Sequence, residues 1–271
     1  MWIKKLAQFG YLTKGVVYLM LSVLVLQLIL ASNDLEIETD TLGALQVISV
    51  QPFGRLLLSI ITMGLISYAF WRFVQAIADP DGSQKSFQRI LVRLGYGLSG
   101  LSYLGLSFSA AKIILDFNED TASMSDWTAK LLALPYGRWL VGLAGFAVIG
   151  VGCSYFQYSF NLGSKNRHDF QEVENTLAKI FLTIGKFGMA ARGVVFSLVG
   201  FFLIRAAWRF DPQEARGLDG ALRVLAQQPF GQVMLVLVAC GLFSYSVHML
   251  VEARYRKMDS LKEVAKDLKN L

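Results

Sequence analysis

The sequence has few charged residues and few of the residues that build metal or disulfide sites. Only 17% of its 271 residues are charged, against about 25% in a typical soluble domain, and 54% are hydrophobic. It has two cysteines, Cys153 and Cys240, and two histidines, His168 and His248, none with metal-ligand or disulfide-framework spacing. We therefore expect a chain that lies in lipid and holds neither a metal nor a cofactor.

Catalytic patterns are missing as well. The chain contains no HExxH, GxSxG or phosphate-binding loop, so no nucleophile, base and orienting group can be assembled, and we expect no enzymatic activity. The hydrophobic segments hold no Asp or Glu near their centres, which disfavours a proton-coupled carrier. The net charge of +6 comes mainly from loops on one side of the predicted membrane segments, so it implies no nucleic-acid partner.

Hydrophobic length indicates six membrane-spanning helices. Four intervals of 19, 18, 26 and 28 residues, at 15–33, 94–111, 139–164 and 224–251, contain no charged side chain. About 20 apolar residues span a bilayer as a helix. Two further apolar segments carry Arg72 in one case and Arg192 and Arg205 in the other. The predicted fold is an all-α membrane protein with spans at roughly 10–30, 54–77, 94–115, 137–160, 187–208 and 230–251.

The chain repeats itself three times. Residues 43–54, GALQVISVQPFG, return as residues 220–231, GALRVLAQQPFG, with eight of twelve positions identical. A weaker copy, Leu134-Pro135-Tyr136-Gly137-Arg138, lies between them. The repeats predict three two-helix segments, 1–80, 81–164 (the divergent one) and 165–255, followed by a basic amphipathic tail at 256–271.

The first helix of each repeat carries small residues at a regular spacing. These residues, seven positions apart in each helix, are Gly15 with Ser22, Gly100 with Ser107, and Gly193 with Gly200. Seven residues are close to two helical turns, so each pair forms a small-residue stripe. Such stripes let helices approach closely in a bilayer, which predicts a helix-packing seam. The alternative is the lining of a narrow pore.

A short segment precedes the second helix of each repeat. Its apolar spacing predicts a short interfacial or re-entrant helix, with Asp219 in one repeat and Asp40 or Thr41 in another as N-caps. A Pro-aromatic-Gly elbow follows, and its glycine is expected to allow the tight turn. The elbow residues are Pro52 and Gly54, Pro135 and Gly137, and Pro229 and Gly231.

The distribution of Lys and Arg predicts the topology. Segments 1–9, 78–94, 161–187 and 252–271 hold 15 basic residues, whereas 31–53, 116–136 and 209–229 hold four. The positive-inside rule places both termini in the cytoplasm of a cell-membrane protein of the bacterial inner-membrane type. All three hairpins then run in the same direction, and a pseudo-threefold bundle is the expected packing.

Basic residues inside the predicted spans are the candidate ligand contacts. Lys14 and Arg192 occupy an inner position, and Lys112 and Arg205 an outer one, with Arg72 on a second helix. They are interpreted either as side chains that snorkel to lipid phosphate or as a ring that binds a lipid phosphate or anion, or guards a pore.

Two polar pairs in the second helices offer a different kind of contact. Tyr68 with Ser67 and Tyr245 with Ser244 are expected to form hydrogen bonds between helices.

These patterns resemble a bacterial membrane family catalogued as domain of unknown function 1206. The resemblance implies six helices in three tandem repeats, and it implies no catalytic residue and no substrate. In the middle repeat Ser99 and Val151 replace the expected basic residue and tyrosine. Two functions remain open: a non-enzymatic scaffold that binds membrane lipid, or a partner protein through the tail, and a channel or carrier for a small solute or anion.

Overall fold

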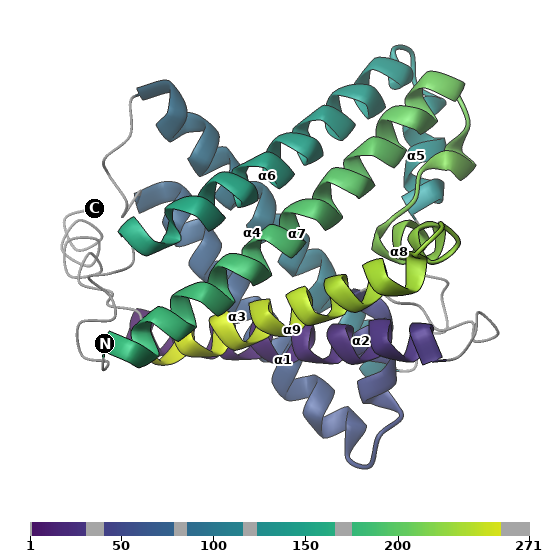
Figure 1. Cartoon of the computed structure of the whole chain (residues 1–271). Helices are drawn as coiled ribbons and strands as arrows, with labels where there is room; N and C mark the ends of the chain where they lie inside the picture. The colour runs from purple at the N-terminus through teal and green to yellow at the C-terminus, as the bar shows by residue number, and fades with distance from the viewer. Residues whose placement is uncertain (1, 31–40, 79–85, 116–123, 166–174, 256–271) are drawn as a thin grey trace. The chain divides into compact units, whose positions relative to one another are not determined.

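The structure is a computed structural model that describes residues 2–30, 41–78, 86–115, 124–165 and 175–255. Within these ranges every regular element is a helix, and there is no strand (Figure 1). The elements are α1 (Trp2–Leu30), α2 (Thr41–Ser49), α3 (Gly54–Ala78), α4 (Ser86–Ile114), α5 (Met124–Leu132), α6 (Gly137–Lys165), α7 (Asn175–Arg209), the 3-10 helix η2 (Pro212–Glu214), α8 (Leu218–Ala226) and α9 (Gly231–Tyr255). The predicted tail at 256–271 and the cap residue Asp40 lie outside the described residues.

Each predicted span falls within a long helix, but the span count differs from the expectation. Five of the described helices, α1, α3, α6, α7 and α9, contain a segment long and apolar enough to cross a membrane. Helix α4 has 29 residues, which is long enough, yet glycine, serine and tyrosine recur along it and dilute its apolar character. Several long apolar helices of this kind are typical of a multi-pass membrane protein.

Two of the long helices begin before the spans predicted for them. Helix α4 begins at Ser86 and α7 at Asn175, several residues before the spans expected at 94 and 187. With 35 residues, α7 is roughly 50 Å long, well beyond the roughly 30 Å of a bilayer core. The residues that precede each of these two predicted spans therefore belong to the same continuous helix as the span.

Short helices precede three of the long ones, as expected. Helices α2, α5 and α8 have nine residues each, and each buries part of one face. The expected N-cap of α8 is wrong: Gly217 is the N-cap and makes no side-chain hydrogen bond. Asp219 lies in the first turn, where its carboxylate accepts a hydrogen bond from Arg223 Nε at 3.0 Å, an i,i+4 pair. Thr41 is the first helical residue of α2.

The elbows between short and long helices have one conformation, and it corrects the role expected for glycine. The residue with positive φ is the aromatic one, at 63° for Phe53, 66° for Tyr136 and 62° for Phe230, and no described glycine has a positive φ. Glycine is required for space. A Cβ on Gly54, Gly137 or Gly231 would lie within 3.0 Å of backbone atoms of the preceding short helix.

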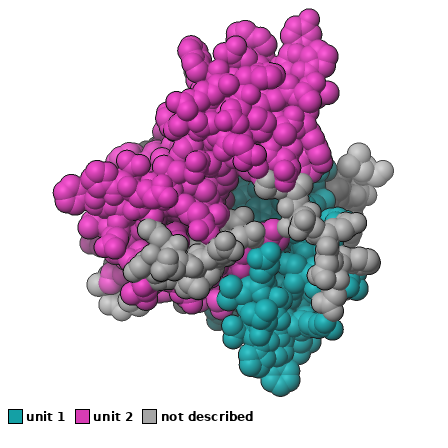
Figure 2. Space-filling view, turned by 90° about the vertical axis from the view of Figure 1, so that its right-hand side faces the viewer, with its two compact units in different colours: residues 1–17, 45–118, 249–271 teal, residues 18–44, 119–248 magenta. Residues whose placement is uncertain are grey.

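The described residues form two compact units, whose boundaries cut across the repeats (Figure 2). Unit 1 comprises residues 1–17, 45–118 and 249–271, and in it α3 packs along α4. Unit 2 comprises residues 18–44 and 119–248, and in it α6 packs along α7. In both cases the second helix of one repeat packs against the first helix of the next.

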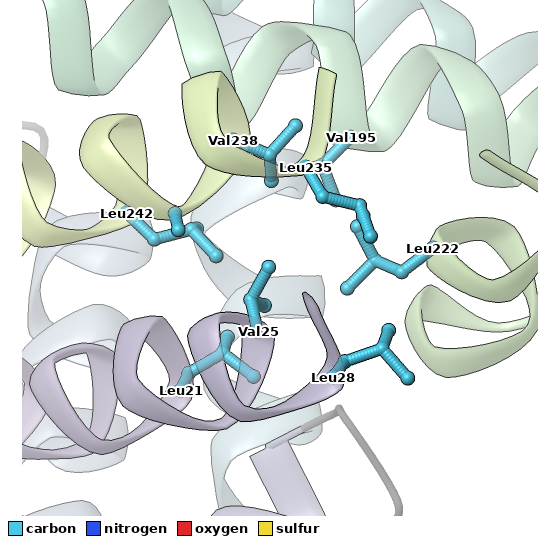
Figure 3. Close-up of a cluster of buried hydrophobic side chains, with 9 residues drawn as sticks. Leu21, Val25, Leu28, Val195, Leu222, Leu235, Val238 and Leu242 are labelled. Atoms are coloured by element: carbon cyan, nitrogen blue, oxygen red, sulfur yellow. The ribbon is translucent and has the colours of Figure 1, made fainter. Parts of the chain in front are cut away.

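A third contact of this type lies in unit 2. Its hydrophobic cluster joins the second half of α1 to α9, with one residue each from α7 and α8 (Figure 3). The members are Leu21, Val25, Leu28, Val195, Leu222, Leu235, Val238, Ala239 and Leu242. Helix α9 is the second helix of the third repeat and α1 is the first helix of the first repeat, so this contact also joins a second helix to a first helix.

Candidate functional site

Two basic side chains are buried in the helices at equivalent positions of the first and third repeats. Lys14 on α1 is 1% exposed and Arg192 on α7 is 6% exposed. Each lies four residues after a glycine of its own helix, Gly10 or Gly188. Burying a cation is costly unless neighbouring groups compensate, so the partners of these two residues define the candidate site.

Lys14 is surrounded by tyrosines of unit 1. Its Nζ donates a hydrogen bond to the Tyr68 hydroxyl at 2.9 Å and lies 4.6 Å and 5.4 Å from the ring centroids of Tyr68 and Tyr103. Arg72 Nη2 donates to the same hydroxyl, and the guanidinium lies 5.1 Å from the Tyr96 ring. Two cations thus share one phenol oxygen. We call these five residues the Lys14 cluster.

Arg192 has a similar environment in unit 2. Its Nη1 donates to the Tyr245 hydroxyl. Four rings surround the guanidinium at 4.7–5.2 Å from its central carbon: Tyr18, Tyr155, Phe196 and Tyr245. Cation–π contacts of this kind contribute about 0.5–2 kcal/mol each, more when the charge is away from water. We call these five residues the Arg192 cluster.

Close helix contacts bring each tyrosine to its cation. A Cβ on Gly10 would lie 2.8 Å from the Cα of Tyr68, and a Cβ on Gly188 would lie 2.6 Å from the Cα of Tyr245. A side chain larger than hydrogen at either glycine would force the helix that carries the tyrosine away. Gly10 and Gly188 therefore set the distance between the basic residue and the hydroxyl in each cluster.

The middle repeat has no equivalent pair. Ser99 stands where the basic residue is expected, and Val151, which is 42% exposed, stands where the tyrosine is expected. The buried basic residue is therefore present in the first and third repeats and absent from the second, and the first repeat adds Arg72 beside the same tyrosine hydroxyl.

The structure corrects the snorkelling interpretation for Lys14 and Arg192. A snorkelling side chain places its charged end in water, whereas both of these charged ends are buried among aromatic rings.

The remaining basic candidates have partners within the protein. Arg72 also donates to Gln75 Oε1 at 3.1 Å, and Lys112 Nζ lies 5.5 Å from the Phe108 ring centroid. Arg205 forms an ion pair with Glu214 at 2.9 Å. Lipid-phosphate or anion contact at these residues stays a prediction.

Within each polar pair of the second helices, the tyrosine and the serine form different kinds of hydrogen bond. The tyrosines bond between helices, to Lys14 and Arg192, as expected. The serines do not: Ser67 Oγ and Ser244 Oγ donate to the carbonyls of Met63 and Cys240 in their own helices. A serine in a helix reaches the carbonyl one turn earlier more easily than a neighbouring helix.

The small-residue stripes lie at helix contacts in two repeats. Cβ atoms on Gly193 and Gly200 would lie 3.0 Å and 2.7 Å from the carbonyl oxygens of Gly152 and Gly145 on α6. Gly152 and Gly145 are themselves seven residues apart, so two glycine stripes face each other across α6 and α7. A Cβ on Gly100 would lie 3.0 Å from the Phe73 ring.

In the other stripe positions, the serine hydroxyls bond within their own helices. Ser22 donates to the Leu19 carbonyl at 2.7 Å and Ser107 to the Leu104 carbonyl at 2.8 Å, and both residues are buried. Gly15, which pairs with Ser22 in the first stripe, lies on α1.

Two arginines donate hydrogen bonds to carbonyls at the ends of long helices, a contact that no sequence pattern predicted. Arg93 donates from Nη2 to the Ile77 carbonyl at 2.9 Å, at the end of α3. Arg138 donates from Nε and Nη2 to the Ala207 and Trp208 carbonyls at 3.0 Å and 3.1 Å, at the end of α7. Carbonyls in a last helical turn have no partner within the helix, and a cation there is favourable.

Within the described residues, no group of three or more His, Cys, Asp or Glu side chains is placed to hold a metal ion. Cys153 and Cys240 are free thiols on exposed positions. The clusters around Lys14 and Arg192 therefore remain the chemically distinctive feature of the described chain.

Known proteins resemble this chain along nearly its whole length. The family described as Domain of Unknown Function (DUF1206) matches residues 9–79, 94–159 and 187–256, one segment in each repeat. An uncharacterised protein of Bacillus subtilis (strain 168), YxxB, is 33% identical over 257 residues, which cover 95% of this chain and 92% of the relative. No solved structure matches the chain.

Proposed function

Because the chain belongs to the DUF1206 family, with three tandem segments that match in turn, we propose that it is a six-span membrane protein built around a pseudo-threefold axis. The contacts of α3 with α4, α6 with α7 and α9 with α1 support this proposal. Each joins the second helix of one repeat to the first helix of the next, so three such contacts would close a ring. Helix α4 would then be the sixth span, held by protein contacts despite its lower apolar content.

The proposed orientation has both termini in the cytoplasm and the elbows on the opposite side of an inner-membrane-type bilayer. The distribution of basic residues supports it, with 15 Lys and Arg in the segments assigned to the cytoplasm and four in the others. The Lys14 and Arg192 clusters would lie toward the cytoplasmic side. The reason is that Tyr68 and Tyr245 are far along α3 and α9 from the elbows at which these helices begin.

Within this architecture we propose a non-enzymatic scaffold that binds membrane lipid or another membrane protein. The observation that carries the proposal is the burial of Lys14 and Arg192 in rings of tyrosine and phenylalanine. A pore that conducts anions exposes its cations to a water-filled path. These two cations instead join α1 to α3 and α7 to α9, which is the role of polar side chains that hold membrane helices together.

Two features support lipid as a partner. Large apolar side chains are exposed along the spans, including Leu143 at 69% and Phe146 at 65% on α6. Arg72, Lys112 and Arg205 are only partly buried, so they are the basic side chains that lipid phosphate could reach. A cytoplasmic or membrane protein that docks on the tail at 256–271 is the alternative partner.

The test is a comparison of solute flux and lipid retention in the same preparation. Purified protein is reconstituted in phosphatidylcholine–phosphatidylglycerol vesicles, and chloride and phosphate efflux is followed with an ionophore as the positive control. Lipid bound after extraction is measured by native mass spectrometry. We expect efflux equal to that of protein-free vesicles, together with retained phosphatidylglycerol.

Two pairs of variants are compared. The first pair is Lys14→Gln and Arg192→Gln, and the second pair is Arg72→Gln and Lys112→Gln. The scaffold proposal predicts that the first pair lowers stability and leaves efflux at the background level. It predicts that the second pair reduces retained phosphatidylglycerol. Efflux above background that falls in the Arg192→Gln variant would show a conducting path and would overturn the scaffold proposal.

A further inference from the structure

The three elbows carry exposed aromatic side chains that no described part of the protein covers. Phe53 is 85% exposed, and Tyr136 and Phe230 are each 81% exposed. Each occupies the same place in its repeat, one residue before the long helix begins. Large exposed rings at three equivalent positions indicate that the same kind of surrounding contacts all three.

The backbone at these residues makes the aromatic choice costly. Each has a φ between 62° and 66°, a conformation that costs a residue with a Cβ roughly 1–2 kcal/mol and that glycine or asparagine adopts more easily. Each also supplies the carbonyl that accepts the first bond of the following helix, from the amides of Leu57, Leu140 and Met234. That is the N-cap position, where Ser, Asp or Asn is preferred because the side chain can accept a helix amide.

An aromatic ring therefore occupies each elbow against two local preferences. Nothing inside the elbow explains the ring, since the turn is closed by backbone hydrogen bonds from Gly54, Gly137 and Gly231 at 2.7–2.8 Å. Strain that recurs at equivalent positions points to a use for the side chain. The position identifies that use, because the segments able to cross a membrane start at these same three glycines.

We propose that Phe53, Tyr136 and Phe230 anchor the starts of α3, α6 and α9 in the headgroup region of the bilayer, where lipid contacts the exposed rings. Tyrosine and tryptophan concentrate at this level of a membrane, where an amphipathic ring meets both acyl chains and polar groups. Tyr136 fits that pattern, and the phenyl rings of Phe53 and Phe230 would lie on its acyl side. Each of the three residues is at least 81% exposed, so the rings are free to contact lipid. The inference rests on the proposed membrane-spanning architecture, but not on the scaffold role.

The test measures the depth of each elbow in the bilayer. Single cysteines replace Phe53, Tyr136 or Phe230 in a Cys153→Ala, Cys240→Ala background and are labelled with bimane. The protein is reconstituted in phosphatidylcholine–phosphatidylglycerol vesicles with nitroxides at the headgroup, at carbon 5 or at carbon 12 of the acyl chain. Far-ultraviolet circular dichroism confirms the helix content of each variant.

The expected result is quenching at least about twofold stronger by the headgroup and carbon-5 nitroxides than by the carbon-12 nitroxide, at all three elbows. The control is Phe146→Cys, nine residues into α6, or about 14 Å along the helix. Its label should be quenched most by the carbon-12 nitroxide, since about 15 Å is half the thickness of a bilayer core.

The outcomes separate the two proposals. If the Phe146 label is not quenched by any lipid nitroxide, the membrane-spanning architecture itself fails. If that label behaves as expected while an elbow label is quenched by iodide in the water and not by lipid, the anchor inference is wrong. Protection of an elbow label from both quenchers would place it against another protein and would likewise overturn the inference.

Discussion

Removing one hydroxyl from each cluster tests whether buried cations hold the helix pairs together. Tyr68→Phe keeps the ring beside Lys14 and Arg72 but removes the oxygen that accepts from both. Tyr245→Phe removes an oxygen that accepts from Arg192. Because the rings remain, the cation–π contacts persist and the change isolates the hydrogen bonds.

The structure sets the relative size of the two effects. A hydrogen bond from a charged donor contributes about 1.5–3 kcal/mol in soluble proteins, and bonds between membrane helices are weaker, up to about 1.7 kcal/mol. With about 1–2 kcal/mol for each bond described, Tyr245→Phe should lower the free energy of unfolding by at least about 1 kcal/mol and Tyr68→Phe by at least about 2 kcal/mol.

The assay is reversible unfolding by sodium dodecyl sulfate in mixed micelles, followed by circular dichroism. Tyr136→Phe is the matched control, because its hydroxyl lies on an elbow residue that is 81% exposed, and we expect a change within about 0.5 kcal/mol. Lys14→Met combined with Tyr68→Phe should show a coupling energy of at least about 0.5 kcal/mol. A loss for Tyr68→Phe no larger than that for Tyr136→Phe would refute the reasoning.

Four further variants address the helix contacts and the ion pairs of Glu214. Gly200→Leu should lower the unfolding free energy by about 2–3 kcal/mol or more, because its Cβ would lie 2.7 Å from the Gly145 carbonyl oxygen. Gly150→Ala is the control, because no atom lies within 4 Å of the added Cβ. In the same assay it should be neutral or stabilising by up to about 1 kcal/mol. Gly137→Ala should shift α5 away from the start of α6 and expose the backbone of the elbow, which faster amide hydrogen exchange there would reveal; unchanged exchange would contradict the close-approach argument. Glu214→Gln should lower the unfolding free energy by less than about 1 kcal/mol, since its arginine partners are 39% and 58% exposed, and the small effect should shrink further in high salt.

The repeat could be predicted from the sequence because similar residues recur at a similar spacing in three places. The short helices α2, α5 and α8, the elbows after them and the long helices that follow were all predicted from the glycine and proline positions. Helix type and order depend on local pattern, which sequence shows directly. The family match over the three segments agrees with that prediction.

Details of the turns were harder to predict, because they depend on competing local energies. Asp219 has the chemistry of an N-cap, but the helix starts earlier and the side chain pairs with Arg223 one turn later. The elbow glycine has the freedom to adopt a positive φ, yet the aromatic residue beside it takes that conformation. Sequence identifies the residues of a turn more reliably than their conformations.

The sequence by itself determined which residues recur: a basic side chain four positions after a glycine, and a tyrosine in the second helix of the same repeat. Only the tertiary structure decided that these two meet, with Lys14 on Tyr68 and Arg192 on Tyr245, and that aromatic rings from neighbouring repeats complete the enclosure. The physical reason is that hydropathy depends on residues near in sequence, whereas the environment of a buried charge depends on which helices pack around it.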